Sequence, residues 1–67
     1  MNAYVTLEGY VVRRTTELAI GISRMDEPFA PLAWLPRSAC DQGEHLVEGD
    51  DDIVVRESIA EEKGLDF

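Results

Sequence analysis

The chain has little cysteine, little basic charge and no long apolar run. Its one cysteine, Cys40, cannot form an internal disulfide and has no second cysteine with which to build a zinc site. A reducing, cytoplasmic setting is therefore expected, because disulfides mark oxidising compartments. No stretch approaches the roughly 18 consecutive apolar residues of a membrane span. Residues 1–3 also lack the basic region that opens a secretory signal. We therefore expect a cytoplasmic protein without a membrane partner.

The chain also lacks the length for a second domain. Its 67 residues predict a single small acidic domain over 1–67. A chain this short buries only about 60% of the surface that its unfolded form exposes, which leaves little core volume for a deep substrate cleft. The hydrophobic content of 45% is nevertheless that of a folded protein. This combination argues against an enzyme.

Basic residues are scarce, and the acidic excess is unevenly placed. The formal net charge is −8, yet residues 1–40 hold four acidic and four basic residues. Residues 41–67 hold ten acidic residues against only Arg56 and Lys63, so the whole excess lies in this part. Such a field repels nucleic-acid phosphates and anionic lipid and attracts basic surfaces. We therefore expect a basic protein partner and no direct contact with nucleic acid.

What the chain does contain is a pattern of short β-strands. Apolar and polar residues alternate over the first part, and valine, isoleucine, threonine and tyrosine are frequent there. Turn residues at 13–16 separate the first two strands. The predicted strands are 4–12, 17–23, 32–35, 45–47 and 53–56. The expected fold class is α+β, mostly β, with a small antiparallel sheet of four to five strands and a short C-terminal helix.

The same alternation predicts which side chains form the core. The predicted core residues are Val5, Leu7, Leu18, Ile20 and Ile22.

The aromatic residues divide between core and surface. Trp34 lies within an apolar run and is predicted to be buried. Tyr4 and Tyr10 share a strand face with polar residues, so partial exposure is expected for them.

The C-terminal helix has both a start and a stop signal. Ser58 and Glu61 have the spacing of a capping box. Gly64 is suited to the left-handed position that ends a helix, with Leu65 folding back onto the last turns. The helix is too short to be stable alone, so we expect it to pack on the sheet.

Two groups of residues could carry chemistry, and for each a structural role is favoured. Cys40 and His45 are the only obvious candidates for a nucleophile and a base, but no oxyanion hole or third orienting residue accompanies them. The run Asp50-Asp51-Asp52 could collect a cation, but it lacks the alternating ligands and closing glutamate of a calcium loop. A solvated turn that guards a strand edge explains it better. We predict no catalytic residue, no metal site and no cofactor.

The acidic residues of the later part are the candidate binding site. If they share one exposed ridge, carboxylates spaced about 6.6 Å along a strand approach the charge density of a DNA strand, which has one charge per roughly 3.4 Å. A role in solubility alone is the competing explanation, and the sequence does not decide between them. The candidate partner-binding residues are Glu44, Glu48, Asp50, Asp51, Asp52, Glu57, Glu61 and Glu62.

The chain resembles small acidic anti-CRISPR proteins of phages in its size, charge and strand content. The segments WLPRS at 34–38 and AEEKGL at 60–65 are similar to stretches of small phage and prophage proteins. Within the anti-CRISPR group the pattern is most like an inhibitor of the type I-C Cascade complex. The resemblance implies a monomeric DNA mimic in the host bacterial cell that blocks target-DNA recognition. Its implied partner is the basic surface of the large Cascade subunit that reads the protospacer-adjacent motif.

A second class of function stays open. The chain could be a small phage or prophage structural or adaptor protein, or an acidic antitoxin. Such a protein would bind through an apolar strand edge or through the face that Tyr4 and Tyr10 are expected to share.

Overall fold

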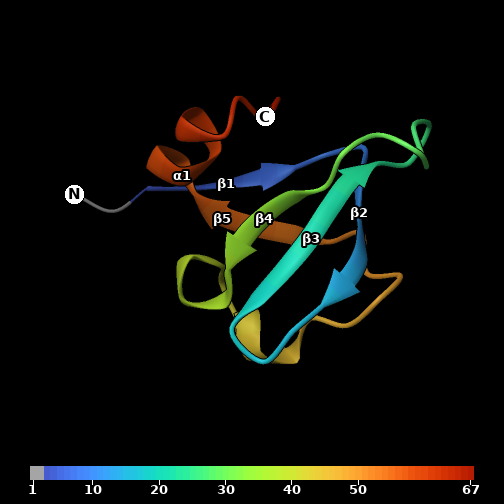
Figure 1. Cartoon of the computed structure of the whole chain (residues 1–67). Helices are drawn as coiled ribbons and strands as arrows, with labels where there is room; N and C mark the ends of the chain where they lie inside the picture. The colour runs from blue at the N-terminus through green and yellow to red at the C-terminus, as the bar shows by residue number, and fades with distance from the viewer. Residues whose placement is uncertain (1–2) are drawn as a thin grey trace.

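The computed structural model describes residues 3–67 and consists mostly of β-strand (Figure 1). Two antiparallel sheets, one of two strands and one of three, are followed by a short C-terminal helix. The elements are β1 (Tyr4–Leu7), β2 (Tyr10–Thr15), β3 (Ala19–Arg24), β4 (Ala33–Pro36), β5 (Ile53–Arg56) and α1 (Glu57–Glu62), with single 3₁₀ turns η1 (Arg37–Ala39) and η2 (Gly43–His45). The mostly-β class with a C-terminal helix is confirmed. The strands form the sheets β1–β5 and β2–β3–β4 rather than one sheet of four or five strands.

The predicted first strand, 4–12, is divided in two by Gly9. This residue has a φ of 82°, which is strained for any side chain, and its carbonyl accepts a 2.8 Å hydrogen bond from the Met25 amide. The chain turns here, so that β1 joins β5 while β2 joins β3. The turn also separates the two tyrosines. Tyr10 is 6% exposed and Tyr4 46% exposed, so the prediction of a shared tyrosine face is wrong.

The first hairpin forms, but its turn lies later than predicted. β2 continues to Thr15, and Thr16 closes the turn by donating its amide to the Ala19 carbonyl at 2.8 Å. The Thr16 hydroxyl also accepts a 3.0 Å bond from the Ala19 amide. Leu18 therefore lies on the turn and is 78% exposed, so its predicted place in the core is wrong.

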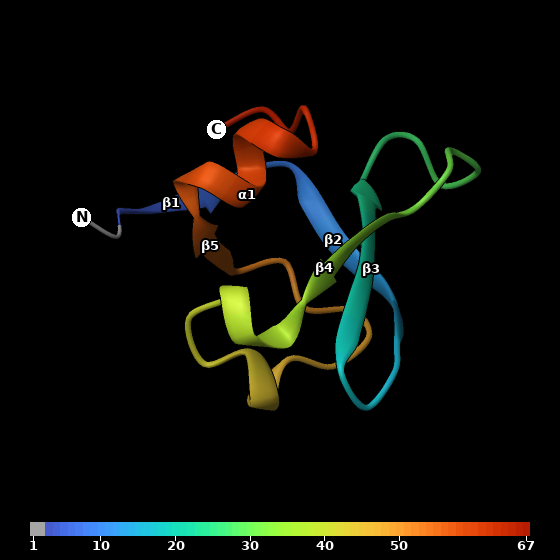
Figure 2. The ribbon, with the colours of Figure 1, turned by 60° about the vertical axis from the view of Figure 1, so that its left-hand side comes forward.

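One hydrophobic core lies between the inner faces of the two sheets (Figures 1 and 2). Leu7, Ile20 and Ile22 are fully buried, as predicted, and Val5 packs against them in a partly buried position. Trp34 is 43% exposed, so its predicted burial is wrong. Because side chains alternate along a strand, the fully buried Leu35 directs its neighbour Trp34 to the outer face of β4.

The predicted strand at 45–47 is wrong, because His45 ends the turn η2 instead. This part of the chain reaches the sheet earlier, through Cys40, which forms an isolated antiparallel bridge with Val55. The Asp41 amide then donates a 2.8 Å hydrogen bond to the Val54 carbonyl. The second edge of β5 is thereby covered by the 40–41 segment.

The helix begins differently from the prediction and ends as predicted. α1 starts at Glu57, whose amide donates to the Ala3 carbonyl at 2.9 Å, and no side chain caps it, so Ser58 is not the cap. The strand β5 leads directly into the helix, and pairing with β1 replaces a cap. At the other end Gly64 has a φ of 69°, and the Leu65 amide donates to the Ala60 carbonyl at 2.9 Å. The left-handed Gly64 and this hydrogen bond form the glycine-terminated helix end that the sequence predicts.

Within residues 3–67 no helix has the length and apolar character needed to cross a membrane.

Candidate acidic binding site

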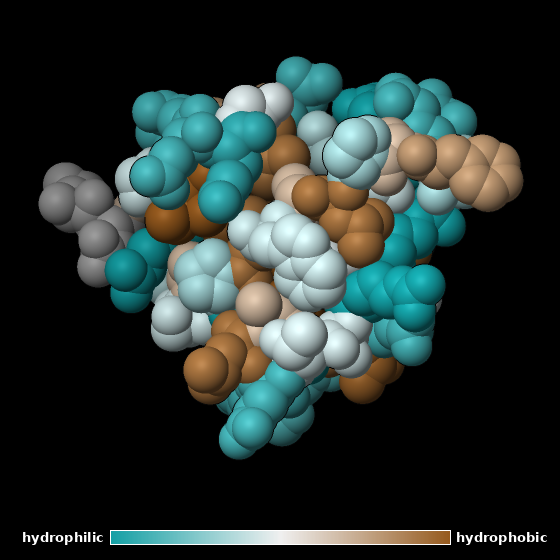
Figure 3. Space-filling view, viewed as in Figure 1, coloured by the Kyte–Doolittle hydropathy of each residue, from teal (hydrophilic) through white to brown (hydrophobic). Residues whose placement is uncertain are grey.

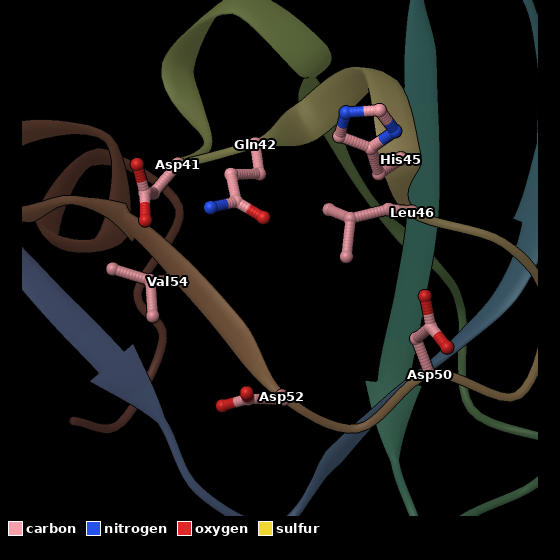
Figure 4. Close-up of a pocket in the computed structure, with 7 residues that line it drawn as sticks. All are labelled: Asp41, Gln42, His45, Leu46, Asp50, Asp52 and Val54. Carbon is pink, nitrogen blue, oxygen red and sulfur yellow. The ribbon is translucent and has the colours of Figure 1, made fainter.

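Three aspartates surround a shallow depression of about 380 Å³ on the outer side of β5 (Figure 4). Leu46, which is buried, and Val54, which is half-buried, contribute the apolar part of the lining. The complete lining is Asp41, Gln42, His45, Leu46, Asp50, Asp52 and Val54. The depression therefore combines carboxylates from two segments with a small apolar surface.

The backbone brings these aspartates together from separate parts of the chain. Asp41 is placed by the hydrogen bond from its backbone amide to the Val54 carbonyl, and Asp52 directly precedes β5. Asp50 is anchored by its carbonyl, which accepts a 2.8 Å bond from the Val12 amide. The Asp50 carboxylate accepts a 3.0 Å bond from the Val47 amide and so also holds its own turn. We call Asp41, Asp50, Asp51 and Asp52 the acidic patch.

Only part of the predicted binding site belongs to this patch. Asp50, Asp51 and Asp52 are members, and Asp41 is a member that the sequence did not single out. Glu44 and Glu48 line two other surface depressions. The remaining predicted residues, Glu57, Glu61 and Glu62, lie on α1 at the far end of β5.

The single continuous ridge expected from the sequence is interrupted. Along β5 the buried Ile53 and Val55 point inward, so Val54 and Arg56 share the outer face. An apolar and a basic side chain therefore stand between the patch and the acidic residues of α1. The patch is a local cluster rather than one end of a long row.

Within residues 3–67 the patch carboxylates form no ion pair. The ion pairs in this part of the chain join Arg24 to Asp26 and Asp66, at 3.6 and 3.2 Å, and His45 to Glu44 at 3.6 Å. Asp41, Asp51 and Asp52 are exposed. Their negative charge is therefore not neutralised by an ion pair within the described residues.

Two arginines, Arg37 and Arg13, are held by backbone carbonyls of the fold. Arg37 donates to the carbonyls of Thr16, Gly43 and Leu46, at 3.0, 2.6 and 2.9 Å.

Arg13 is held in the same way. It donates to the Ser23 hydroxyl at 3.0 Å and to the carbonyls of Arg24 and Met25 at 3.1 and 3.3 Å. Such bonds from a charged donor are stronger than neutral ones, so these guanidinium groups act as structural ties.

Cys40 and His45 have the environments of structural and surface residues. Cys40 is buried, its sulfur donates to the Pro36 carbonyl at 3.6 Å, and burial raises the pKa of its thiol while Arg37 opposes this rise. A raised pKa disfavours the nucleophilic thiolate. His45 is exposed beside Glu44.

In the described part of the chain, no group of three or more histidine, cysteine, aspartate or glutamate residues is arranged to hold a metal ion.

No protein family, curated protein or solved structure matches this chain. What the chain does must therefore be inferred from its own residues and geometry. The residue that sequence reasoning missed, Asp41, has no local signal that distinguishes it from the other acidic residues. It approaches Asp52 only because Cys40 pairs with Val55, a contact between segments 15 residues apart.

Proposed function

We propose that the chain is a non-enzymatic protein that binds a basic, nucleic-acid-binding protein surface through the acidic patch. The observation that carries the proposal is the clustering of aspartates that form no ion pair within residues 3–67, while Arg13 and Arg37 are bound to backbone carbonyls. Lysine and arginine side chains of a partner would form charge-assisted hydrogen bonds with these carboxylates. Their methylene stems would pack on Leu46 and Val54.

The particular partner that we propose is a CRISPR Cascade complex of type I-C, at the large-subunit surface that recognises target DNA. The small size, the net charge of −8 and the resemblance to anti-CRISPR proteins support this choice. Because the patch has four carboxylates, it would replace a few phosphates rather than a long stretch of duplex. Its attraction to a basic surface would speed association and weaken as salt is added.

The test is inhibition of target-DNA binding by purified type I-C Cascade in an electrophoretic mobility shift. The wild-type chain is expected to block the shift at about 0.1 M salt and to do so at least tenfold less well at about 0.4 M. The triple variant Asp41→Asn, Asp51→Asn, Asp52→Asn is expected to lose inhibition. Asp50 is left unchanged because its carboxylate holds the turn.

The matched control neutralises three exposed glutamates outside the patch and has the same net charge. It carries Glu8→Gln, Glu27→Gln and Glu62→Gln. Equal loss in both triple variants would mean that overall charge, not the patch, matters. No inhibition by the wild-type chain at either salt concentration would refute the Cascade assignment.

The alternative role as an adaptor or antitoxin loses one of its proposed surfaces. Tyr10 is buried, so it cannot form an interface together with Tyr4. The edge strand β4 follows Pro31 and ends at Pro36, and prolines at a strand edge oppose the addition of another strand. The mimic is therefore the better supported proposal.

A further inference from the structure

An apolar stripe crosses the outer face of the β2–β3–β4 sheet, on the opposite side of the core from β5. We define it as Leu18, Phe29, Leu32 and Trp34, of which Phe29 is 99% exposed. In Figure 3 apolar and weakly polar residues run across the centre of this face, with hydrophilic residues around them. Gly21 forms the floor, because a Cβ there would lie 3.0 Å from Leu32 Cδ1 and 3.2 Å from the Trp34 ring.

The surface depressions at the two ends of the stripe have linings of opposite net charge, although the β3–β4 loop itself also carries the exposed Asp26 and Glu27. At the Phe29 end, Arg13 and Arg14 line a groove of about 520 Å³ beneath the β3–β4 loop, with Glu48 as the one acidic residue. At the Leu18 end, the surface around this side chain includes Glu17 and Glu44, together with the carbonyl-bound Arg37. The end of the stripe beside Phe29 therefore has a groove with a basic lining, and the other end has the protruding Leu18 beside acidic residues.

The β3–β4 loop holds Phe29 in a defined position. Its turns are closed by the Glu27 amide on the Arg24 carbonyl, at 3.1 Å, and by the Ala30 amide on the Glu27 carbonyl, at 3.2 Å. Pro28 further restricts the backbone beside Phe29. The backbone that carries the ring therefore needs little further ordering on binding, which favours binding through Phe29.

We propose that the stripe is the interface of a two-fold symmetric dimer of this chain. A two-fold axis that lies in the interface, parallel to the sheet and at right angles to the stripe above Gly21, exchanges the ends of the stripe. Leu18 of one protomer then enters the groove beside Phe29 of its partner, and Glu17 meets Arg14, twice over. A two-fold interface requires such self-complementarity, and β3 sets the same separation of the two ends in both protomers.

Charge placement favours a second copy as the occupant. Two chains of net charge −8 repel each other, so they approach best where acidic and basic residues are balanced. The stripe lies on such a face, since Arg14 and Glu17 are both exposed and form no ion pair within residues 3–67. The acidic patch lies across the core, on the side of β5, and stays free in the dimer. The proposed dimer differs from the monomer that the resemblance implies.

The size of the stripe sets the expected strength of the dimer. A fully exposed aromatic side chain offers on the order of 200 Å², so Phe29, Trp34 and Leu18 together contribute on the order of 400 Å² per protomer. The whole interface is then near the ~1,000 Å² at the low end of specific interfaces, and we expect a dissociation constant of roughly 0.1 mM.

The test is sedimentation equilibrium of the full chain from about 10 µM to about 1 mM. The average mass is expected to rise from 7.5 kDa towards twice that value. Leu18→Asp, at an exposed position, is expected to stay monomeric. A wild-type chain that remains monomeric at about 1 mM would overturn the proposal.

Charge variants test the two-fold arrangement itself. Glu17→Arg lowers the net charge to −6 and so reduces repulsion, yet it is expected to weaken the dimer roughly tenfold. Asp51→Arg, with the same net charge, should leave the dimer unchanged or strengthen it. The double variant Glu17→Arg, Arg14→Glu is expected to restore the wild-type constant within about twofold. Equal behaviour of Glu17→Arg and Asp51→Arg, or no recovery in the double variant, would contradict the arrangement.

Discussion

The β2–β3–β4 sheet and the connection from residue 37 to residue 52 are stabilised in different ways. The sheet has a regular antiparallel register, one bulge beside Arg13 and an inner face of branched aliphatic side chains. The connection has no strand and only two single turns of 3₁₀ helix. Its course is set by the Arg37 guanidinium, by the close approach at Gly43 and by the Asp50 carboxylate.

Because of this difference, the two regions should differ in their sensitivity to single substitutions. In the sheet each strand is held by many equivalent contacts, so a small change at one position is shared among neighbours. The connection is joined to the sheets by a few backbone bonds, and each of its side-chain contacts is made by a single residue. The acidic patch lies on the connection, so its geometry depends on those contacts. Four substitutions, from the largest expected effect to the smallest, test this contrast.

The largest effect is expected for Gly43→Ala. A Cβ at this buried position would overlap the Arg37 carbonyl oxygen, so the backbone must move. We expect a loss of about 3 kcal/mol in the free energy of unfolding, measured by urea denaturation. Gly49→Ala is the control, because its φ of 95° is strained but nothing lies within 4 Å. A smaller loss for Gly43→Ala than for Gly49→Ala would contradict the tight contact.

Arg37→Met is expected to cost about 2 kcal/mol, because it leaves three backbone carbonyls without their donor. Arg14→Met, at an exposed position, should change stability by less than about 0.5 kcal/mol. Both are compared by urea denaturation at low micromolar concentration. If the two variants are equally stable, Arg37 is not a tie of the connection.

Asp50→Ala is expected to cost about 1 kcal/mol, since the Val47 amide loses its acceptor. Asp50→Asn keeps an acceptor oxygen and should retain most of the stability. Asp51→Ala removes an exposed carboxylate and should be within about 0.5 kcal/mol of wild type. Thermal unfolding of the three variants gives the comparison, and equal losses at both positions would show that the Asp50 bond contributes nothing.

The smallest effect concerns alkaline pH. Burial holds the pKa of Cys40 above its ordinary value of 9.0, so the folded state keeps this proton more firmly than the unfolded state. The contribution is complete below that value and is lost as pH rises through the higher folded-state pKa. Unfolding free energies between pH 7 and pH 10 should therefore fall less steeply for Cys40→Ala than for wild type. Parallel curves would exclude Cys40 as a cause.

The sequence predicted well where a local pattern decides the structure. Ile20 and Ile22 are buried because alternation along a single strand already assigns them one face. Gly64 ends the helix because its left-handed conformation is a local preference. The predicted burial of Leu18 was wrong because the turn is displaced by two residues, which moves Leu18 out of the strand. The predicted burial of Trp34 was wrong because a short apolar run does not reveal which residue points inward.

The sequence by itself determined that the chain is acidic, that its excess charge follows residue 40, and that strands dominate. These properties depend on residue counts and on neighbours in the sequence. The tertiary structure alone decided that Asp41 approaches Asp52 while Glu57 does not, and that Arg37 binds carbonyls instead of carboxylates. Those outcomes follow from the pairing of distant segments around a shared core, and the alternation within each segment does not encode that pairing.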